Sequence, residues 1–380
     1  MSVQWRTRLA VLAASLLTAT LFTASGAAGV RAASCDNWTG FLPPSPGDES
    51  GLSGVTAVSP CNVWAVGSSL NAIAEQHLSL AEHWNGAAWK VVPTPSPDTT
   101  SNFLEAVDSV SATDVWAVGF TGNNSLIVRW NGTIWKVVPS PDPGSDFNDL
   151  SGVNAVSASS AWAVGQFSVG AGPQPLLLRW NGKKWGRATI PSPAAGGVLE
   201  AVTATGASNA WAVGVANTSI GEKTMILHWN GKQWARVASP NPQGKTAEVA
   251  LKGVAATSAS NAWAVGDYAS ANGDKSLILH WNGRAWKQVP SPNPGLFRSV
   301  LGVAATSTKN AWAVGTYNTH AGQKTLILHW NGRAWKQVPS PNPGTVNELA
   351  SVAAVSASNI WAVGDFGSGG PNQVLIAHCC

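Results

Sequence analysis

The sequence predicts an all-β fold, a seven-bladed β-propeller with four antiparallel strands in each blade. The motif Trp-Ala-Val-Gly occurs seven times at spacings of 46 to 52 residues, beginning at Trp64, Trp116, Trp162, Trp211, Trp263, Trp312 and Trp361. A second motif, Trp-Asn-Gly-x-x-Trp, begins at Trp84, Trp130, Trp180, Trp229, Trp281 and Trp330. Each copy of this second motif leads into a Pro-rich segment. Periods of this length are typical of propellers, solenoids or arrays, and short strands separated by turn residues favour the propeller.

One repeat, residues 251–294, shows how the four strands of a blade arise. We name the strands a to d in chain order and expect them at 253–257, 262–268, 276–281 and 285–289. Ser and Asn side chains in 258–261 favour the a–b turn. Asn282-Gly283 predicts a type I′ hairpin between c and d, because that turn needs positive φ at both central positions. Pro290 ends strand d because it has no N–H to donate.

The repeated aromatic residues are interpreted as scaffold. Large rings at the same position of nearly every blade are expected to fill the space between neighbouring sheets, with each indole N–H donating to a backbone carbonyl. A histidine precedes the second-motif position at His83, His228, His280, His329 and His378. Because Arg129 and Arg179 stand at the same position, we expect no metal ligand there. No other metal site and no cofactor is predicted.

The last repeat is incomplete, which locates the point where the ring closes. Residues 374–378 match strand c, but no strand d follows them, whereas residues 38–46 near the other end match strand d. We therefore expect the last blade to take three strands from the C-terminus and one from the N-terminus, which pairs an otherwise free sheet edge. Residues 35–380 would form one domain, with blades at 48–97, 98–142, 143–193, 194–242, 243–294, 295–343, and 344–380 together with 35–47.

The four cysteines lie near this closure. Cys35 aligns with the position after Cys380, and Cys61 falls in the a–b turn of the first blade. Four cysteines allow three pairings. We expect Cys35 and Cys61 each to bond one of Cys379 and Cys380, since a bridge between adjacent residues is strained. Metal binding by these thiols is the alternative.

Residues 1–34 are interpreted as a signal peptide. Arg6 and Arg8 precede an apolar stretch at 9–23, and small residues at Val30 and Ala32 flank Arg31 in the pattern of a cleavage site. The apolar stretch is shorter than the roughly 20 residues of a membrane span. We expect a secreted, monomeric protein with no transmembrane segment in the mature chain. Lipid attachment at Cys35 is the alternative, although the residues before it lack the Leu of a lipobox.

The charge distribution argues against nucleic acid as a partner. Charged residues make up 11% of the chain, and the formal net charge is +4. The longest run of basic residues is Lys183-Lys184, so the sequence lacks the clustered Lys and Arg that bind phosphate backbones.

The segments Trp263-Ala264-Val265-Gly266 and His280-Trp281-Asn282-Gly283, with Trp286 and Val289-Pro290, resemble a kelch repeat. The resemblance covers residues 35–380 and departs from kelch in having one Gly where kelch has a pair. The Asn-Gly-x-x-Trp turn is also similar to the Asp-box turn of sialidases and of photosystem II assembly-factor propellers, with Asn in place of Asp. Both resemblances imply a four-stranded blade, and neither implies a particular function.

Candidate binding residues lie on the face that carries the b–c and d–a loops, where the repeats differ. Four blades have an aromatic residue two positions after the repeated Gly, which would place rings around one rim. Glu105, Glu200 and Lys252 share a position at the start of strand a that should face the central funnel. The candidate ligand-binding residues are Glu105, Phe167, Glu200, Lys252, Asp267, Tyr268, Tyr317, His320, Asp365 and Phe366.

No catalytic residue is assigned. The variable loops contribute one arginine, Arg298, where a sialidase needs three, and no Gly-x-Ser-x-Gly nucleophile turn is present. We expect a non-catalytic extracellular module that binds a protein or a cell-surface component. The alternative is a propeller that binds or cleaves carbohydrate, because aromatic rings beside carboxylates suit sugars and a pair of funnel carboxylates suits glycosidase or lyase chemistry.

Overall fold

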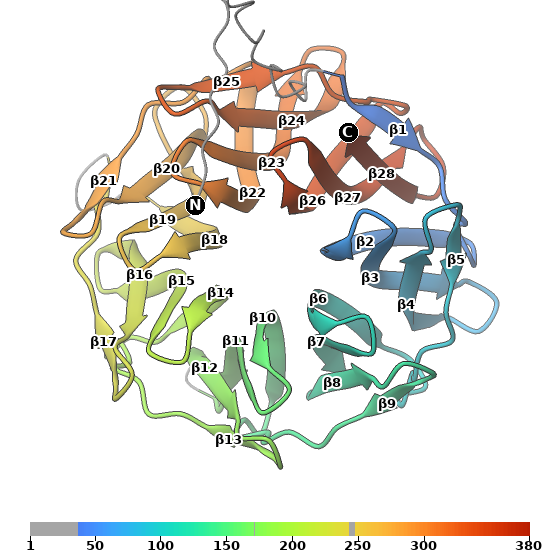
Figure 1. The fold of residues 1–380 in the computed structure, drawn as a ribbon, viewed down its shortest axis with the longest axis horizontal. Coiled ribbons are helices and arrows are strands. Elements are labelled where there is room, and N and C mark those ends of the chain that lie inside the picture. Colours follow the sequence, from blue (N-terminus) through green and yellow to red (C-terminus); the bar gives the residue numbers. More distant parts are fainter. Residues whose placement is uncertain (1–36, 171, 243–247) are drawn as a thin grey trace, which may run out of the picture. The chain divides into compact units, whose positions relative to one another are not determined.

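The computed structural model describes residues 37–380 except 171 and 243–247. The predicted signal peptide and Cys35 lie outside these residues. Within them the chain forms seven four-stranded antiparallel sheets arranged around a central axis (Figure 1), which confirms the predicted propeller. No helix in the described part of the chain is long and apolar enough to cross a membrane.

Strands of each class occupy the same layer of every blade (Figure 1). The innermost strands, a, are β2 (Glu49–Ser59), β6 (Asn102–Ser111), β10 (Phe147–Ser157), β14 (Gly197–Gly206), β18 (Val249–Ser258), β22 (Leu296–Ser307) and β26 (Val346–Ser356). Strands b are β3 (Asn62–Asn71), β7 (Asp114–Thr121), β11 (Ser160–Ser168), β15 (Asn209–Thr218), β19 (Asn261–Tyr268), β23 (Asn310–Thr319) and β27 (Asn359–Gly367). Strands c are β4 (Gln76–Trp84), β8 (Asn124–Trp130), β12 (Pro173–Trp180), β16 (Gly221–Trp229), β20 (Lys275–Trp281), β24 (Gly322–Trp330) and β28 (Gln373–Cys379). The outermost strands, d, are β5 (Trp89–Val91), β9 (Trp135–Val137), β13 (Trp185–Arg187), β17 (Trp234–Arg236), β21 (Trp286–Gln288), β25 (Trp335–Val338) and β1 (Thr39–Phe41).

The ring closes in the seventh blade, as predicted. Its sheet has the order β1-β28-β27-β26, so the first strand of the described chain is the outer strand of the last blade (Figure 1). The pairing is antiparallel and sets Thr39 opposite His378 and Phe41 opposite Ile376. The Val374 N–H donates to Ser45 Oγ at 3.1 Å, which extends the contact beyond the strand. Closure in this way covers an edge that would otherwise be free to pair with other chains.

The core consists of apolar clusters between neighbouring blades, built around the strand-b tryptophans. Trp263 is fully buried and packs edge-to-face on Trp335 of the next blade, with ring centroids 5.1 Å apart. Trp330 of that blade lies at 5.0 Å, and His280 stacks on Trp263 at 4.2 Å. The repeated aromatic residues are therefore inter-blade packing, as their periodicity predicts.

The two kinds of tryptophan differ in their hydrogen bonds. The second-motif indoles donate to a carbonyl of the a–b turn, as Trp281 Nε1 does to Ala259 O at 3.0 Å. Five strand-b indoles, that of Trp263 among them, are buried with no acceptor among the described residues, whereas Trp361 Nε1 donates to Asn359 Oδ1 at 3.2 Å. The prediction of a backbone acceptor thus holds for Trp281 and its equivalents and is wrong for Trp263, whose ring is enclosed by other rings. Four of the histidines at the repeated position contact an asparagine, as His280 Nε2 does at 2.8 Å from Asn261 Oδ1, whereas His378 Nε2 is buried with no partner among the described residues.

The c–d turn differs from the predicted type I′ hairpin. Gly283 has φ of +88°, but Asn282 is not among the described non-glycine residues with positive φ. Instead, Asn282 Oδ1 accepts hydrogen bonds from the N–H groups of Arg284 and Ala285, at 3.0 and 3.1 Å. The asparagine is required here as an acceptor that closes an Asx turn, so the turn needs only one residue with positive φ.

The disulfide prediction is wrong for two of the four cysteines. Cys61 and Cys380 are free and exposed. Cys61 packs over the c–d turn of its own blade, where a Cβ added to Gly86 would lie 3.0 Å from Cys61 Cβ. Other blades place Thr113, Ser159, Ser208, Ser260 or Lys309 at this position. Cys61 therefore occupies a packing position within its blade and does not reach across to the closure.

Candidate functional site

The central channel is lined by one extra residue from the innermost strand of each blade. The pairing of strands a and b shifts by one residue at the same point in all seven blades, which makes a β-bulge. The bulged residues, which we call the bulge ring, are Ser53, Glu105, Ser151, Glu200, Lys252, Leu301 and Ala350. All seven line a hollow of about 610 Å³. Bulges re-aim side chains, and here they present a different residue type from almost every blade.

Three carboxyl groups gather on one side of the channel. Glu105 and Glu200 belong to the bulge ring, and Asp149 lies two residues before the ring position of the blade between them. The pKa of Glu105 is raised to about 7, mainly by burial and also by the neighbouring charges of Asp149 and Glu200. A hydrogen bond with Ser53 acts in the opposite direction and lowers this pKa. Burial raises the pKa of Asp149 to about 6, and burial and Asp149 together raise that of Glu200. Burial and mutual repulsion therefore favour the protonated forms of these acids.

The one cation of the bulge ring is paired. Lys252 Nζ lies 3.0 Å from Asp267 Oδ1 and donates to Ser299 Oγ at 2.9 Å. Ser299 Oγ in turn donates to Asp267 Oδ1 at 2.6 Å. The structure thus brings the predicted candidates Lys252 and Asp267 into direct contact. Because Asp267 already balances Lys252, the channel carries an excess of negative charge whenever the other carboxyl groups are ionised.

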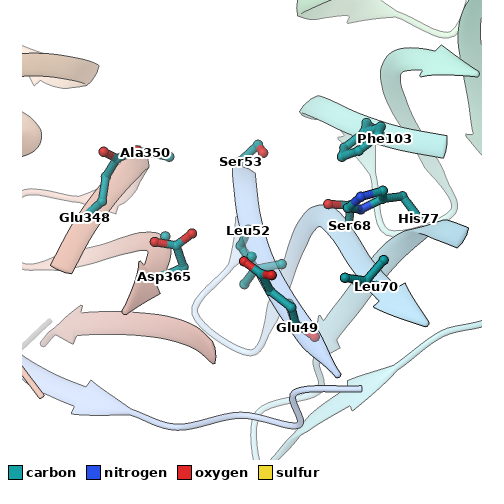
Figure 2. Close-up of a pocket in the computed structure, with 13 residues that line it drawn as sticks. Glu49, Leu52, Ser53, Ser68, Leu70, His77, Phe103, Glu348, Ala350 and Asp365 are labelled. Atoms are coloured by element: carbon teal, nitrogen blue, oxygen red, sulfur yellow. The ribbon is translucent and has the colours of Figure 1, made fainter. Parts of the chain in front are cut away.

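A second hollow, of about 300 Å³, opens between the seventh and first blades (Figure 2). Glu348 and Asp365 project from the seventh blade toward Glu49 on β2. Burial is the main cause that raises the pKa of both Glu348 and Asp365. The second cause is repulsion by a neighbouring carboxylate, which is Asp365 in the case of Glu348 and Glu49 in the case of Asp365. At the other side His77 lies against Phe103, with ring centroids 4.6 Å apart. Acidic groups therefore line both the channel and its neighbouring hollow.

The predicted aromatic rim is not formed. Phe167 and Tyr268 are buried, at 7% and 9% exposure, and Tyr317 and Phe366 pack against inter-blade clusters. Side chains alternate between the two faces of a strand, so a residue two positions after the repeated Gly points into the core. The residue directly after that Gly lies on the opposite face of the strand, where Asp267 contacts Lys252 and Ser299.

The remaining candidate, His320, is exposed at the turn between β23 and β24 and lines neither hollow. Glu49 and Glu348 line the hollow between the seventh and first blades, Asp149 lies close enough to raise the pKa of Glu105 and Glu200, and none of the three was among the candidates. With the bulge known, the sequence could have indicated them, because each lies two or four residues before the bulge position and therefore on the same side of strand a.

Asp108 connects three blades farther along the channel. Its carboxylate accepts hydrogen bonds from Asn154 Nδ2 at 2.9 Å, the Ala155 N–H at 2.8 Å and Thr56 Oγ1 at 3.2 Å. Burial raises its pKa to about 6 against these bonds. We assign Asp108 a structural role, because its acceptor oxygens are already engaged by the neighbouring innermost strands.

Comparison with known proteins shows the fold and no family. No family model matches the chain, and no curated protein matches its sequence. Among solved structures, a YCF48 protein bound to a D1 peptide is 16% identical, with a TM-score of 0.56 over 90% of this chain and 95% of that one. The WD40 repeats of RRP9 are 10% identical, with a TM-score of 0.56 over 90% and 97%. A GH74 xyloglucanase from Xanthomonas campestris is 14% identical, with a TM-score of 0.55 over 89% of this chain and 55% of that one. At these identities the likeness establishes a β-propeller, whose relatives include both peptide-binding and carbohydrate-active proteins.

Proposed function

We propose that this chain is a non-catalytic binding scaffold that takes a cationic segment of a partner protein into the mouth of its central channel. The observation that carries the proposal is the bulge ring. The strands around it repeat almost unchanged, whereas its residues are Ser, Glu, Ser, Glu, Lys, Leu and Ala in successive blades. Variation among the residues that line a hollow on a repeated scaffold is typical of a binding site.

The charge of the channel defines the partner. Glu105 and Glu200 line the channel, the charge of Asp149 acts on both, and the nearby Lys252 is paired with Asp267. A concave surface lined by one sign of charge and bounded by poorly polarisable walls concentrates its field. An inserted Lys or Arg side chain would relieve the repulsion between these acids. A protein segment of opposite charge is therefore the ligand class that the channel fits best.

A screen of randomised displayed peptides tests this proposal. We expect the enriched sequences to carry Lys or Arg, and we expect E105Q/E200Q to lose them because two carboxylates leave the ring. Glu75→Gln is the matched control, since Glu75 is an exposed acid in the β3–β4 turn, outside both hollows. Enrichment of acidic or neutral sequences, or equal loss with E75Q, would contradict the proposal.

The second candidate function is carbohydrate cleavage, and one observation favours it. Glu105 holds a proton near neutral pH beside the carboxyl groups of Asp149 and Glu200, which is the environment that tunes a carboxylic acid to act as a general acid. The test is release of new sugar ends from a polysaccharide panel, abolished by Glu105→Gln. If no polysaccharide is cleaved while cationic peptides bind, this second candidate fails.

The proposed setting is extracellular, with residues 1–34 as the export signal, and the protein acts as a monomer. An oxidising setting permits a bridge between Cys35 and Cys379. The register supports this pair, because Thr39 lies opposite His378 and the N-terminal strand runs beside the strand that ends at Cys379. Mass spectrometry of the unreduced, alkylated protein should find the 35–379 linkage together with alkylated Cys61 and Cys380. An alkylated Cys379 would refute the bridge.

A further inference from the structure

A third hollow, of about 670 Å³, lies at the outer wall of the propeller between the third and fourth blades. It is bounded by β13 on one side and by the turn before β17 on the other, far from the central channel (Figure 1). Its cationic lining residues are Arg179, Lys184, Arg187 and Lys232. Among the residues that the structure describes, no carboxylate lines it. Its charge is thus opposite to that of the channel, so an occupant of one would not suit the other.

The hollow is open because the third blade departs from the repeat. Gly186 pairs with Arg179 across β13 and β12. Four other blades place a lysine at the position of Gly186, namely Lys90, Lys136, Lys287 and Lys336. A Cβ added to Gly186 would meet no atom within 4 Å, so open space lies above this residue. The absence of a side chain here leaves the floor of the hollow uncovered.

None of the four cations forms an ion pair among the described residues, and Arg179 is the one that stacks on rings lining the hollow. Its guanidinium lies over the rings of Trp162 and Trp229, 5.1 and 5.5 Å from their centroids. The equivalent Arg129 of the second blade stacks in the same way but also forms two hydrogen bonds with Asp114, at 2.7 and 2.8 Å. In the third blade Ser160 stands at the position of Asp114. Arg179 therefore keeps its stacked, oriented geometry while its N–H groups remain available to a ligand.

We propose that this hollow binds an anionic saccharide through a carboxylate or sulfate group held by Arg179. A guanidinium fixed on indole rings presents two parallel N–H donors, which match the oxygens of either anion. Lys184 and Lys232 add positive charge on the two sides, and Asn181 and Gln233 add amide groups. Ala188, Ile190 and Pro191 supply an apolar strip for the C–H face of a sugar ring. A volume of about 670 Å³ suits a small ligand of a few rings.

Calorimetry with defined sugars tests the proposal on the full-length mature protein. The probes are digalacturonate, which carries carboxylates, a sulfated heparin disaccharide, and the neutral disaccharide cellobiose. We expect at least one anionic probe to bind and cellobiose not to bind. Arg179→His, which installs the residue of the other blades, should weaken binding about tenfold or more, because a charge-assisted pair of hydrogen bonds is lost.

Gly186→Lys and Lys183→Ala separate a specific site from general attraction. Gly186→Lys adds positive charge but fills the hollow with the side chain of other blades, so we expect it to abolish binding. Lys183→Ala removes one charge from an exposed lysine that does not line the hollow, so we expect less than about a twofold effect. Unchanged melting temperatures would show that the variants fold.

Four results would overturn the proposal. They are no binding of either anionic sugar, equal binding of cellobiose, tighter binding by Gly186→Lys, and equally tight, Arg179-dependent binding of a hexaglutamate peptide. The last result would assign the hollow to acidic protein segments and not to sugars. None of them bears on the cationic partner proposed for the channel, which uses other residues.

Discussion

Replacing Glu82 by leucine should stabilise the propeller, and more at pH 8 than at pH 5. Glu82 is fully buried in β4, and neither carboxyl oxygen has a hydrogen-bond partner among the described residues. The equivalent residue is leucine in four other blades, at Leu178, Leu227, Leu279 and Leu328. Leu80, on the same face of β4, belongs to the cluster between the first and seventh blades. The polar group therefore lies in the apolar core beside the closing blade.

The magnitude follows from proton linkage. Burial raises the pKa of Glu82 from 4.5 to about 8. The folded state then holds a proton that the unfolded state has released, so the free energy of unfolding falls as the pH rises from about 4.5 to about 8. An interval of about 3.5 pH units corresponds to at most about 5 kcal/mol. Glu82→Leu removes this loss and the cost of an unpaired buried group.

Urea denaturation at pH 5 and pH 8 measures both effects. We expect Glu82→Leu to be more stable than the wild type at both values, with the larger difference, about 3 to 5 kcal/mol, at pH 8. Glu82→Gln is the control, since it removes the titration but retains an unpaired polar group. Other acids whose pKa is raised, such as Glu105, also make the stability depend on pH. The relevant quantity is therefore the difference in the free energy of unfolding between the wild type and the variant at each pH. An equal difference at the two pH values, or a less stable leucine variant at pH 8, would refute the reasoning.

Three further changes test the fold. Phe41→Ala should cost about 2 kcal/mol and speed hydrogen exchange in β28 more than in β16, because Phe41 joins β1 to Trp361 and Trp84; uniform exchange would argue against a closing role. Asn282→Ala should cost about 1 to 2 kcal/mol in thermal unfolding by deleting two hydrogen bonds of the Asx turn, whereas Asn282→Asp should retain most of the stability. Gly266→Ala should prevent folding, since its Cβ would lie 2.0 Å from Ala250 O; a soluble, cooperatively unfolding variant would contradict that steric argument.

The fold could be predicted from the sequence because its signals repeat. Trp263 contacts His280 of its own blade and Trp335 of the next blade, and tryptophans equivalent to Trp263 recur at a similar spacing in every repeat. The closure was predictable for the same reason: the strand d missing after His378 has its match near Phe41. Because the same pattern occurs in seven repeats, the strands of one repeat can be checked against those of the others. Both the topology and the strand register could therefore be predicted.

The candidate site was predicted less well, because orientation within a strand depends on single-residue register. The sequence predicted that Glu105, Glu200 and Lys252 share a repeat position facing the funnel, and these residues line the channel. The aromatic residues such as Tyr268 were assigned to the rim, although one step of alternation turns them into the core. The positions of Asp149 and Glu49 could not be predicted, because the β-bulge determines the orientation of the side chains that precede it. The sequence pattern alone does not reveal the bulge. The role of Arg179 could not be predicted either, because it depends on two other residues. Gly186 is its partner on the adjacent strand, and Ser160 replaces the aspartate that pairs with the equivalent arginine of the second blade.

Proton release on binding is the most direct test of a cationic partner in the channel. A positive side chain beside Glu105 would lower its pKa from about 7, so binding at pH 7 should release protons. Calorimetry of the best peptide from the display screen, run in two buffers that differ in ionisation enthalpy, measures the number released. We predict net release from the wild type and markedly less from Glu105→Gln. Proton uptake, or a release that Glu105→Gln leaves unchanged, would contradict the proposed site.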